Sequence, residues 1–190
     1  MKSIKFVSAV AMAAGVLVMG NAQAQAASGG TIRITGSVTD ATCTITGGPG
    51  TDGGTGNVGV ALDPVAATSL QNPGDVANRK DFSLIIGGPG QGSCVNGKVA
   101  SLSFNVASPR IDAATGTLTN ALVGQATHTN IQMTDATGTA LNLASPATVI
   151  NSPAIADNTS TINLGAQYYA TGAATPGLVD TSVQYGVTYN

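Results

Sequence analysis

The sequence predicts an all-β sandwich, and three observations carry that prediction. Short runs of alternating apolar and polar residues recur between clusters of Gly, Asn, Asp and Pro, which is the pattern of strands joined by turns. Residues 27–190 show no convincing helical periodicity. All nine acidic residues are Asp and none is Glu, and Asp favours turns while being poor inside helices. Residues 27–190 have the length of one domain that can bury a core.

Residues 1–26 are predicted to be a cleaved signal peptide. Lys2 and Lys5 provide a positive start, and 6–20 is an apolar, Ala/Val-rich stretch. Ala-x-Ala cleavage sites stand at 22–24 and 24–26, and the second is favoured, so that the exported chain begins at Ala27. A retained membrane helix is disfavoured because the apolar run is about 15 residues long where a span needs roughly 20.

The first predicted strand, 31–39, lies within a predicted N-terminal arm, 27–40. The main domain is predicted at 41–190. Ile32, Ile34 and Val38 share one face of this strand with Gly36, while polar residues share the other face. A strand at a free N-terminus has unpaired backbone groups and apolar side chains. It is therefore a candidate for pairing with another molecule.

Eight more strands are predicted along the domain, each bounded by turn residues. They are expected at 41–46, 57–62, 81–86, 99–106, 130–134, 147–150, 160–170 and 181–189. The sequence Asp-Ala-Thr-Gly at 135–138 separates two apolar pieces, 131–133 and 141–143, as the turn of a hairpin does. Two Gly-rich stretches, 47–54 and 87–92, are expected to be loops.

Cys43 and Cys94 are the two cysteines of the chain. In an exported protein, an even number of cysteines with no thiol left over predicts one structural disulfide. A metal site is not expected, because zinc normally takes four nitrogen or sulfur ligands and the chain has one His besides these cysteines.

The charge of the chain argues against nucleic acid as a partner. Without the signal peptide, five basic residues stand against nine acidic ones, so the formal charge is −4. Two of the basic residues, Arg79 and Lys80, are adjacent, and no other basic cluster exists. The electrostatic footprint of a nucleic-acid-binding surface is therefore missing from the sequence.

Catalytic and cofactor motifs are also missing. His128 is the one histidine, its surroundings at 126–130 are polar, and no Gly-x-Ser-x-Gly motif accompanies it, so an exposed surface imidazole is expected rather than a general base. The Gly-rich stretch 87–92 contains no Lys and leads to Cys94 rather than to a helix, so it does not match a phosphate-binding loop. We expect no enzyme activity and no cofactor.

Three segments carry a resemblance to the subunits of chaperone-usher pili, and to type 1 major fimbrial subunits in particular. Residues 31–43 resemble the donor-strand arm of that family, with Gly36 at the position of its glycine and Cys43 as its first cysteine. Residues 130–141 are similar to the central hairpin, and 167–177 resemble the segment before the last strand. Gly177 and the penultimate Tyr189 match the C-terminal signature. The resemblance covers nearly all of the exported chain.

This resemblance implies an incomplete immunoglobulin-like β-sandwich (pilin fold) that lacks its final strand and is completed by a donor strand from another subunit. In the family, a periplasmic pilus chaperone fills the resulting groove first and the arm of the next subunit fills it later. The donor positions here are Ile32, Ile34, Gly36 and Val38. The expected groove and chaperone positions are Gly177, Val183, Tyr185, Val187, Tyr189 and Asn190, whose C-terminal carboxylate also contributes.

The implied product is a head-to-tail fimbria on the cell surface, reached through the periplasm and an outer-membrane usher. Identical subunits are the expected neighbours, with tip adaptor or adhesin subunits as further candidates. Three alternatives stay open: a minor tip adaptor rather than the rod subunit, a secreted binding module completed by its own arm, and a hydrolase that uses Asp residues with His128. An arm with only four residues ahead of Thr31 is the argument against the rod subunit.

Overall fold

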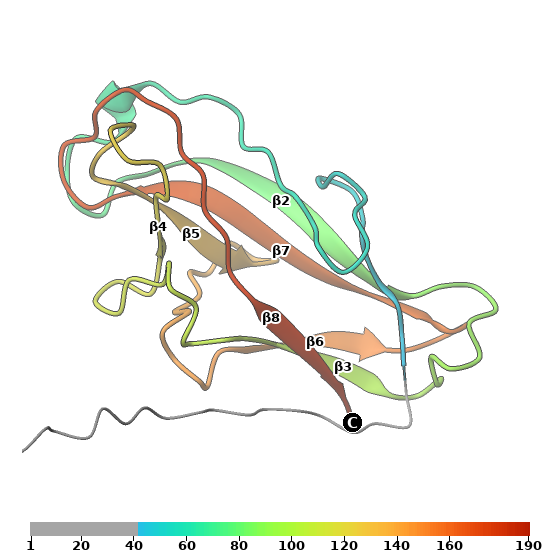
Figure 1. The fold of residues 1–190 in the computed structure, drawn as a ribbon. Helices are drawn as coiled ribbons and strands as arrows, with labels where there is room; N and C mark the ends of the chain where they lie inside the picture. The colour runs from blue at the N-terminus through green and yellow to red at the C-terminus, as the bar shows by residue number, and fades with distance from the viewer. Residues whose placement is uncertain (1–41) are drawn as a thin grey trace, which may run out of the picture. The chain divides into compact units, whose positions relative to one another are not determined.

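The computed structural model describes residues 42–190, which form two antiparallel β-sheets packed on one another (Figure 1). The larger sheet has the strand order β1-β2-β7-β5-β4 and the smaller one has the order β6-β3-β8. The all-β prediction is confirmed, and the signal peptide and the strand expected at 31–39 lie outside the described residues. The elements are β1 (Ile45–Gly47), the 3₁₀ turn η1 (Ala67–Ser69), β2 (Val76–Gly87), β3 (Val99–Phe104), β4 (Leu118–Thr119), β5 (Thr129–Asp135), β6 (Val149–Ala154), β7 (Thr159–Ala170) and β8 (Tyr185–Tyr189).

Strands β2 and β7 form the long centre of the larger sheet. They pair from Val76 opposite Tyr169 to Gly87 opposite Thr159, with an irregularity between Ala77 and Lys80. Apolar side chains on the inner face alternate with polar ones, which is why these segments form strands with one buried face. The inward set is Phe82, Leu84, Ile86, Ile162, Leu164 and Ala166, all buried.

Strand β3 is the centre of the smaller sheet, with β6 on one side and β8 on the other. Its Ala100 and Leu102 are fully buried against the larger sheet, in one core with Ile131 and Met133 of β5. β8 pairs with β3 through five positions, from Tyr189 opposite Ala100 to Tyr185 opposite Phe104. Among the described residues no strand pairs with the other edge of β8.

Seven of the strands predicted within 42–190 overlap observed strands, but the prediction at 57–62 is wrong, because that segment forms no strand. The prediction at 181–189 is correct only from Tyr185 onward. The two-residue β4 was not predicted. The turn at 135–138 and the two Gly-rich loops are confirmed, with hydrogen bonds from Asp135 N to Thr139 O (2.9 Å) and from Leu141 N to Met133 O (2.9 Å) closing the turn.

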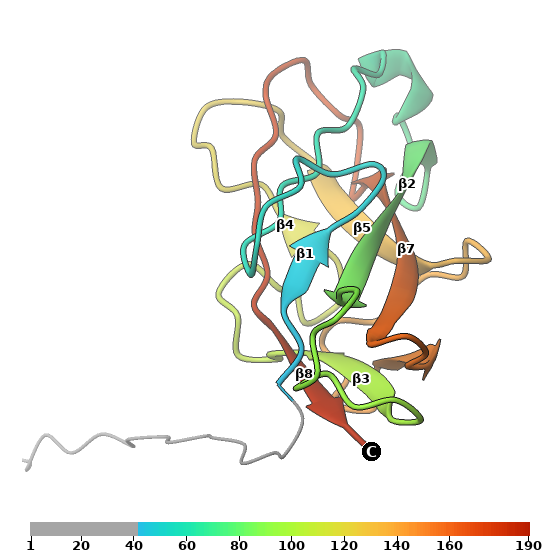
Figure 2. The same cartoon turned by 90° about the vertical axis from the view of Figure 1, so that its right-hand side faces the viewer.

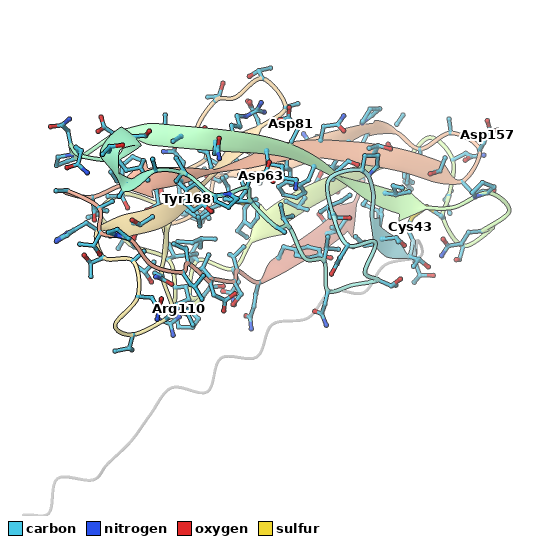
Figure 3. All side chains as sticks on the ribbon, turned by 90° about the horizontal axis from the view of Figure 1, so that it is seen from above. Cys43, Asp63, Asp81, Arg110, Asp157 and Tyr168 are labelled. Atoms are coloured by element: carbon cyan, nitrogen blue, oxygen red, sulfur yellow. A yellow bond between two sulfur atoms is a disulfide. The ribbon has the colours of Figure 1, made fainter. Side chains whose placement is uncertain are left out.

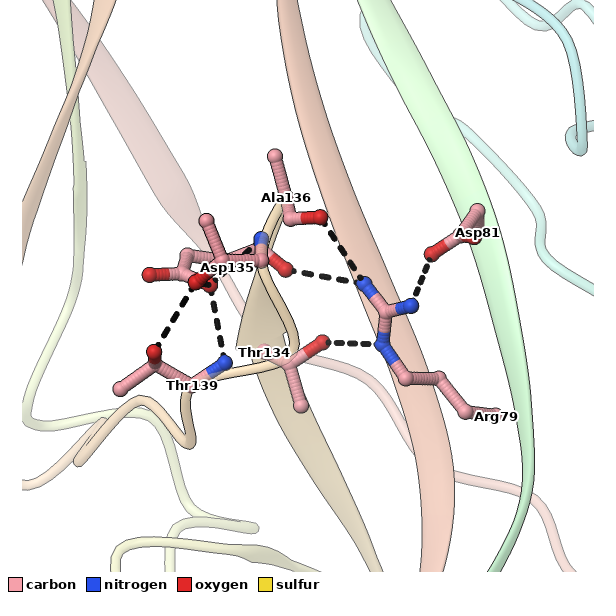
Figure 4. Close-up of polar contacts among 7 residues, drawn as sticks. Arg79, Asp81, Thr134, Asp135, Ala136 and Thr139 are labelled. Atoms are coloured by element: carbon pink, nitrogen blue, oxygen red, sulfur yellow. Dashed lines mark hydrogen bonds and ion pairs between the residues drawn. The ribbon is translucent and has the colours of Figure 1, made fainter.

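Arg79 fastens three strands on the outer face of the larger sheet (Figure 4). Its guanidinium crosses β7, donates to Thr134 Oγ1 and to the carbonyl of Asp135 at 3.0 Å each, and pairs with the Asp81 carboxylate at 2.7 Å. A Cβ on Gly165 would lie 2.5 Å from Thr134 Oγ1 and 2.8 Å from Arg79 Nε. Because Gly165 has no side chain, the Arg79 guanidinium can lie across it. The contacts of Arg79 with Thr134, Asp135 and Asp81 are termed the Arg79 clamp.

The turn at 135–138, which Arg79 contacts, is stabilised by hydrogen bonds of its own. The Asp135 carboxylate accepts hydrogen bonds from the hydroxyl and N–H of Thr137 and from the N–H of Thr139. The hydroxyl of Thr137 and the N–H of Thr139 lower the pKa of Asp135 below its ordinary value of 3.8. The turn thus favours the ionised carboxylate.

Candidate functional site: an apolar groove beside the last strand

A groove of about 890 Å³ opens into the core between β8 and the segment that follows β1. In Figure 2 the chain leading into β8 runs beside this segment, residues 56–62, and the two form the walls of the groove. Core side chains from both sheets form its floor. They include Phe82, Leu84, Leu102, Phe104, Leu118, Ile131, Met133, Leu164, Ala166 and Tyr168.

On the groove side, the backbone groups of β8 have no hydrogen-bond partner among the described residues. Asn190 and Val99 exchange both of their backbone hydrogen bonds at 3.0 Å, and Asn105 N donates to Gln184 O at 2.9 Å. In an antiparallel pair, alternate residues point both backbone groups to the same side. Positions 184, 186, 188 and 190 therefore face β3, while the N–H and C=O groups of 183, 185, 187 and 189 face away from it.

The same odd-numbered positions carry the apolar side chains of the wall. Val183, Tyr185, Val187 and Tyr189 are half-buried and pack against the core, while Gly186 and Thr188 are exposed. Val183 and Tyr185 line the groove itself. Residues 183–189 therefore combine side chains that pack on the core with a backbone edge that no described strand pairs with.

The opposite wall explains why a strand was wrongly predicted at 57–62. Val58, Val60 and Leu62 are half-buried and alternate with more exposed neighbours, as in a strand. A strand is also defined by a ladder of backbone hydrogen bonds, and no strand within residues 42–190 lies beside this segment on the groove side. One contact crosses the groove, where the Tyr185 hydroxyl donates to Gly56 O at 2.6 Å.

Thr181 on the β8 side carries an unsatisfied polar atom. Its Oγ1 is buried and has no hydrogen-bond partner within the part of the chain that the structure describes, although Thr181 lines the groove. A buried hydroxyl without a partner costs about 1–3 kcal/mol. An isolated Thr has no distinctive sequence pattern, so this residue could not be predicted from the sequence.

The base end of the groove lies where β8 ends and where the described chain begins at Thr42. The expected disulfide joins Cys43 and Cys94, with a Cα–Cα distance of 4.5 Å. Tyr189 Oη donates to Cys43 O at 3.4 Å, so the C-terminal strand touches this junction. The expected donor residues Ile32, Ile34, Gly36 and Val38 lie outside the described residues.

Gly177 lies apart from the groove, although sequence analysis grouped it with the last strand. An added Cβ there would overlap the backbone N of Ala126 and the backbone carbon of Gln125. Backbone atoms cannot move aside easily, so this position needs a glycine for close approach of two segments. Asn190, by contrast, is held at the base end by its backbone pair with Val99.

The tyrosines of β8 report the burial of this wall. Burial raises the pKa of both Tyr185 and Tyr189 above the ordinary value of 10.0, since the neutral phenol is favoured away from water. Neither group is prepared to act as a base or nucleophile at neutral pH.

The described residues give little support for catalysis by His128 or for metal binding. His128 is exposed, and its ring lies against Gly172. Within residues 42–190 no cluster of three His, Cys, Asp or Glu side chains is arranged to hold a metal ion. No helix in that part of the chain is long and apolar enough to cross a membrane. The groove is therefore the candidate site.

Comparison with known proteins finds similarity to fimbrial proteins. The family model described as fimbrial protein matches residues 32–190. The chain is 32% identical to the F17 fimbrial protein of Escherichia coli, over 92% of this chain and 95% of that protein. It is 34% identical to the major fimbrial subunit SMF-1 of Stenotrophomonas maltophilia, over 86% and 94%, and 29% identical to the type-1 fimbrial protein, A chain, of Escherichia coli, over 88% and 87%.

Among solved structures, a chaperone-usher pilus described in connection with rod uncoiling aligns with this chain at a TM-score of 0.50. The aligned sequences are 16% identical, and the alignment covers 87% of this chain and 98% of that one. At this identity the likeness concerns the fold alone.

Proposed function

This chain belongs to the fimbrial protein family and is a subunit of a chaperone-usher fimbria, and we propose that it is the repeating rod subunit, polymerised by donor-strand exchange. The relatives are structural fimbrial subunits, so the prediction of a structural protein rather than a hydrolase is confirmed. As a fimbrial subunit it is exported through the periplasm to the cell surface and assembles with other pilin subunits.

The observation that carries the proposal is the groove beside the open edge of β8. An added strand along this edge pairs with the free N–H and C=O groups of positions 183, 185 and 187, which is β-strand addition. The same strand inserts its apolar side chains between the two walls and covers the core. It also brings backbone groups within the neighbourhood of the unpaired Thr181 hydroxyl.

The N-terminal arm has the pattern and the length for this role. Its apolar positions from Ile32 to Val38 span six residue steps, as do positions 183 to 189 along the edge of β8. At about 3.3 Å per residue, each stretch is about 20 Å long. Burying Ile32, Ile34 and Val38 contributes about 1.5–3 kcal/mol each, in addition to the ladder hydrogen bonds.

Because the arm of one copy fills the groove of another, the contact is heterologous and does not close on itself. Repetition of this contact produces a filament. Before assembly the exposed groove is an aggregation hazard. A periplasmic chaperone covers it, docking on β8 and on the C-terminal carboxylate of Asn190, and an outer-membrane usher exchanges the chaperone for the next arm.

The relatives support the rank of rod subunit over that of tip adaptor. SMF-1, the most identical of the relatives named above, is called a major fimbrial subunit, and it is matched over 94% of its length. The groove by itself suits either rank, since both accept a neighbour's arm. On this proposal, tip adaptors or adhesins are partners at the filament end.

The test is the gel mobility of material sheared from expressing cells, run in SDS without reducing agent, with and without boiling. We expect a ladder that collapses on boiling. Ile34→Asp should abolish the ladder because it places a charge on the apolar face of the arm, whereas Thr35→Asp, one residue away on the other face, should preserve it. Equal behaviour of the two variants would refute strand insertion.

A monomer in both lanes, with the cognate chaperone and usher present, would refute the proposal itself. Removal of residues 27–39 then identifies a module completed by its own arm, because that protein would unfold. In a polymerising subunit the same deletion leaves a folded, chaperone-bound protein that accepts an arm but cannot donate one.

A further inference from the structure

Three exposed apolar side chains lie at the end of the molecule opposite Cys43. Leu122 and Val123 belong to the loop before β5, and Leu178 belongs to the segment before β8. Their exposed fractions are 37%, 98% and 68%. These three residues, termed the apex patch, contribute nothing to the core, so burial inside the subunit does not account for them.

The apex patch is fixed to the wall of the groove by one asparagine. Asn120 Nδ2 donates to the carbonyls of Leu178 (2.9 Å) and Ala126 (3.1 Å). Its Oδ1 accepts the N–H groups of Leu122 (3.1 Å) and Asp180 (3.0 Å). All four hydrogen bonds of this amide are therefore used to join the loop to the segment. Since Asp180 lines the groove, the patch continues the groove surface at its apex end.

At the opposite, base end, another exposed apolar side chain lies close in sequence to the contacts of Thr42 and Cys43, where the described chain begins. Val95, 38% exposed, follows Cys94, which is bonded to Cys43. Thr42 N also donates to Ser93 O at 3.0 Å. The disulfide and this hydrogen bond hold Val95 next to the point where the arm leaves the domain. Figure 3 shows Cys43 toward one end of the molecule and Arg110, which pairs with the Thr119 backbone, toward the other.

The length and direction of the arm bring these two ends together in a polymer. This step rests on the proposed strand exchange. β8 runs from the apex to the base, so an arm paired antiparallel to it, the slightly more stable arrangement, leaves the groove at the apex. From Val38 to Thr42 there are four residue steps, which span at most about 14 Å. The base of the donor must then lie against the apex of the acceptor.

We infer that the apex patch docks on the loop around Val95 of the next copy, the one that donates the arm, as a second contact between consecutive subunits outside the donor strand. Apolar side chains meet on both surfaces, and each surface is rigidly joined to its end of the strand-exchange joint. Such a contact fixes the angle between neighbouring subunits, which a single inserted strand leaves free to swivel.

The first test places a photo-crosslinking amino acid at Val123, in fimbriae assembled by cells. After irradiation, crosslinked subunits should form a ladder that survives boiling, with the adduct mapped to residues 91–97 of the neighbour. The same amino acid at Val149, 45% exposed on β6, is the matched control and should give no adduct on that loop. An adduct on the chaperone, or a boiled lane without a ladder beside an intact unboiled ladder, would overturn the inference.

The second test uses a charge pair. Val123→Asp should speed the dissociation of isolated dimers in moderate urea about tenfold, the loss expected for one buried valine contact. Val95→Lys added to this variant should restore the rate, and Val149→Asp should leave it unchanged. Unchanged dissociation of Val123→Asp, or no restoration by Val95→Lys, contradicts the inference while strand exchange stands. Absence of any wild-type ladder contradicts the proposed function instead.

Discussion

Gly165→Ala tests the Arg79 clamp on the outer face of the larger sheet. The new Cβ would overlap Thr134 Oγ1 and Arg79 Nε, so the guanidinium must leave its place. Two charge-assisted hydrogen bonds and one partly exposed ion pair are then lost, which we expect to cost about 2–4 kcal/mol after the guanidinium is hydrated. Replacing Gly by Ala within a strand recovers about 0.5–1 kcal/mol. The expected net loss is therefore about 1–3 kcal/mol.

Gly186→Ala is the matched control, because Gly186 also lies within a strand and its added Cβ would meet nothing within 4 Å. This variant should be slightly more stable than the wild type, so Gly165→Ala and Gly186→Ala should change the free energy of unfolding in opposite directions. Urea unfolding followed by far-UV circular dichroism measures both, since the chain has no Trp for fluorescence.

A double-mutant cycle identifies the cause. In an Arg79→Ala background, Gly165→Ala should cost at least about 1 kcal/mol less than in the wild type, because the displaced guanidinium is already gone. Equal costs in the two backgrounds, or equal shifts for Gly165→Ala and Gly186→Ala, would refute the clamp. Polymer formation should persist in every variant, because the clamp lies on the outer face and not in the groove.

Three further predictions concern the disulfide, the groove and acid stability. Replacing both Cys43 and Cys94 by Ser opens a loop of 51 residues and should lower the free energy of unfolding by about 4 kcal/mol; an unchanged urea midpoint would exclude this role. Thr181→Val removes the unpaired hydroxyl and should stabilise the free subunit by about 1 kcal/mol, with a smaller gain in the polymer; destabilisation of the free subunit would contradict its unsatisfied state. The pKa of Asp135 is lowered from 3.8 on folding, so its stabilisation is present above pH 3.8 and is lost as pH falls through the folded pKa. Asp135→Asn should therefore flatten the fall of the unfolding midpoint in acid, and an acid limb as steep as that of the wild type would disprove this assignment.

Several features could be predicted because their signals are local. The alternation in β2 and β7, the turn at 135–138 and the pairing of two cysteines follow from period, turn chemistry and count. The same local reasoning fails at 57–62. There, alternation reports correctly that Val58, Val60 and Leu62 face the core, but a strand also needs a neighbour, and local sequence does not say whether a neighbour exists.

Contacts in the groove, at the apex and on the outer face of the larger sheet join residues far apart in the chain. Tyr185 reaches Gly56, Asn120 reaches Leu178, and Arg79 reaches Thr134 across Gly165. No pattern around any one of these residues indicates its partner. The close approach of the Gly177 backbone to that of Ala126 likewise could not be predicted from the local sequence, because it depends on how a distant loop packs.

By itself, the amino-acid sequence determined that the domain is built of strands, which residues of each strand face inward, and that an alternating segment precedes Cys43. Only the tertiary structure decided that no strand among residues 42–190 pairs with the outer edge of β8, that a groove of about 890 Å³ lies beside it, and that Cys43 and the apex patch lie at opposite ends of the domain. The physical reason is that side-chain alternation depends on neighbours two residues apart. Strand partners and open edges depend on which distant segments meet when the core is buried.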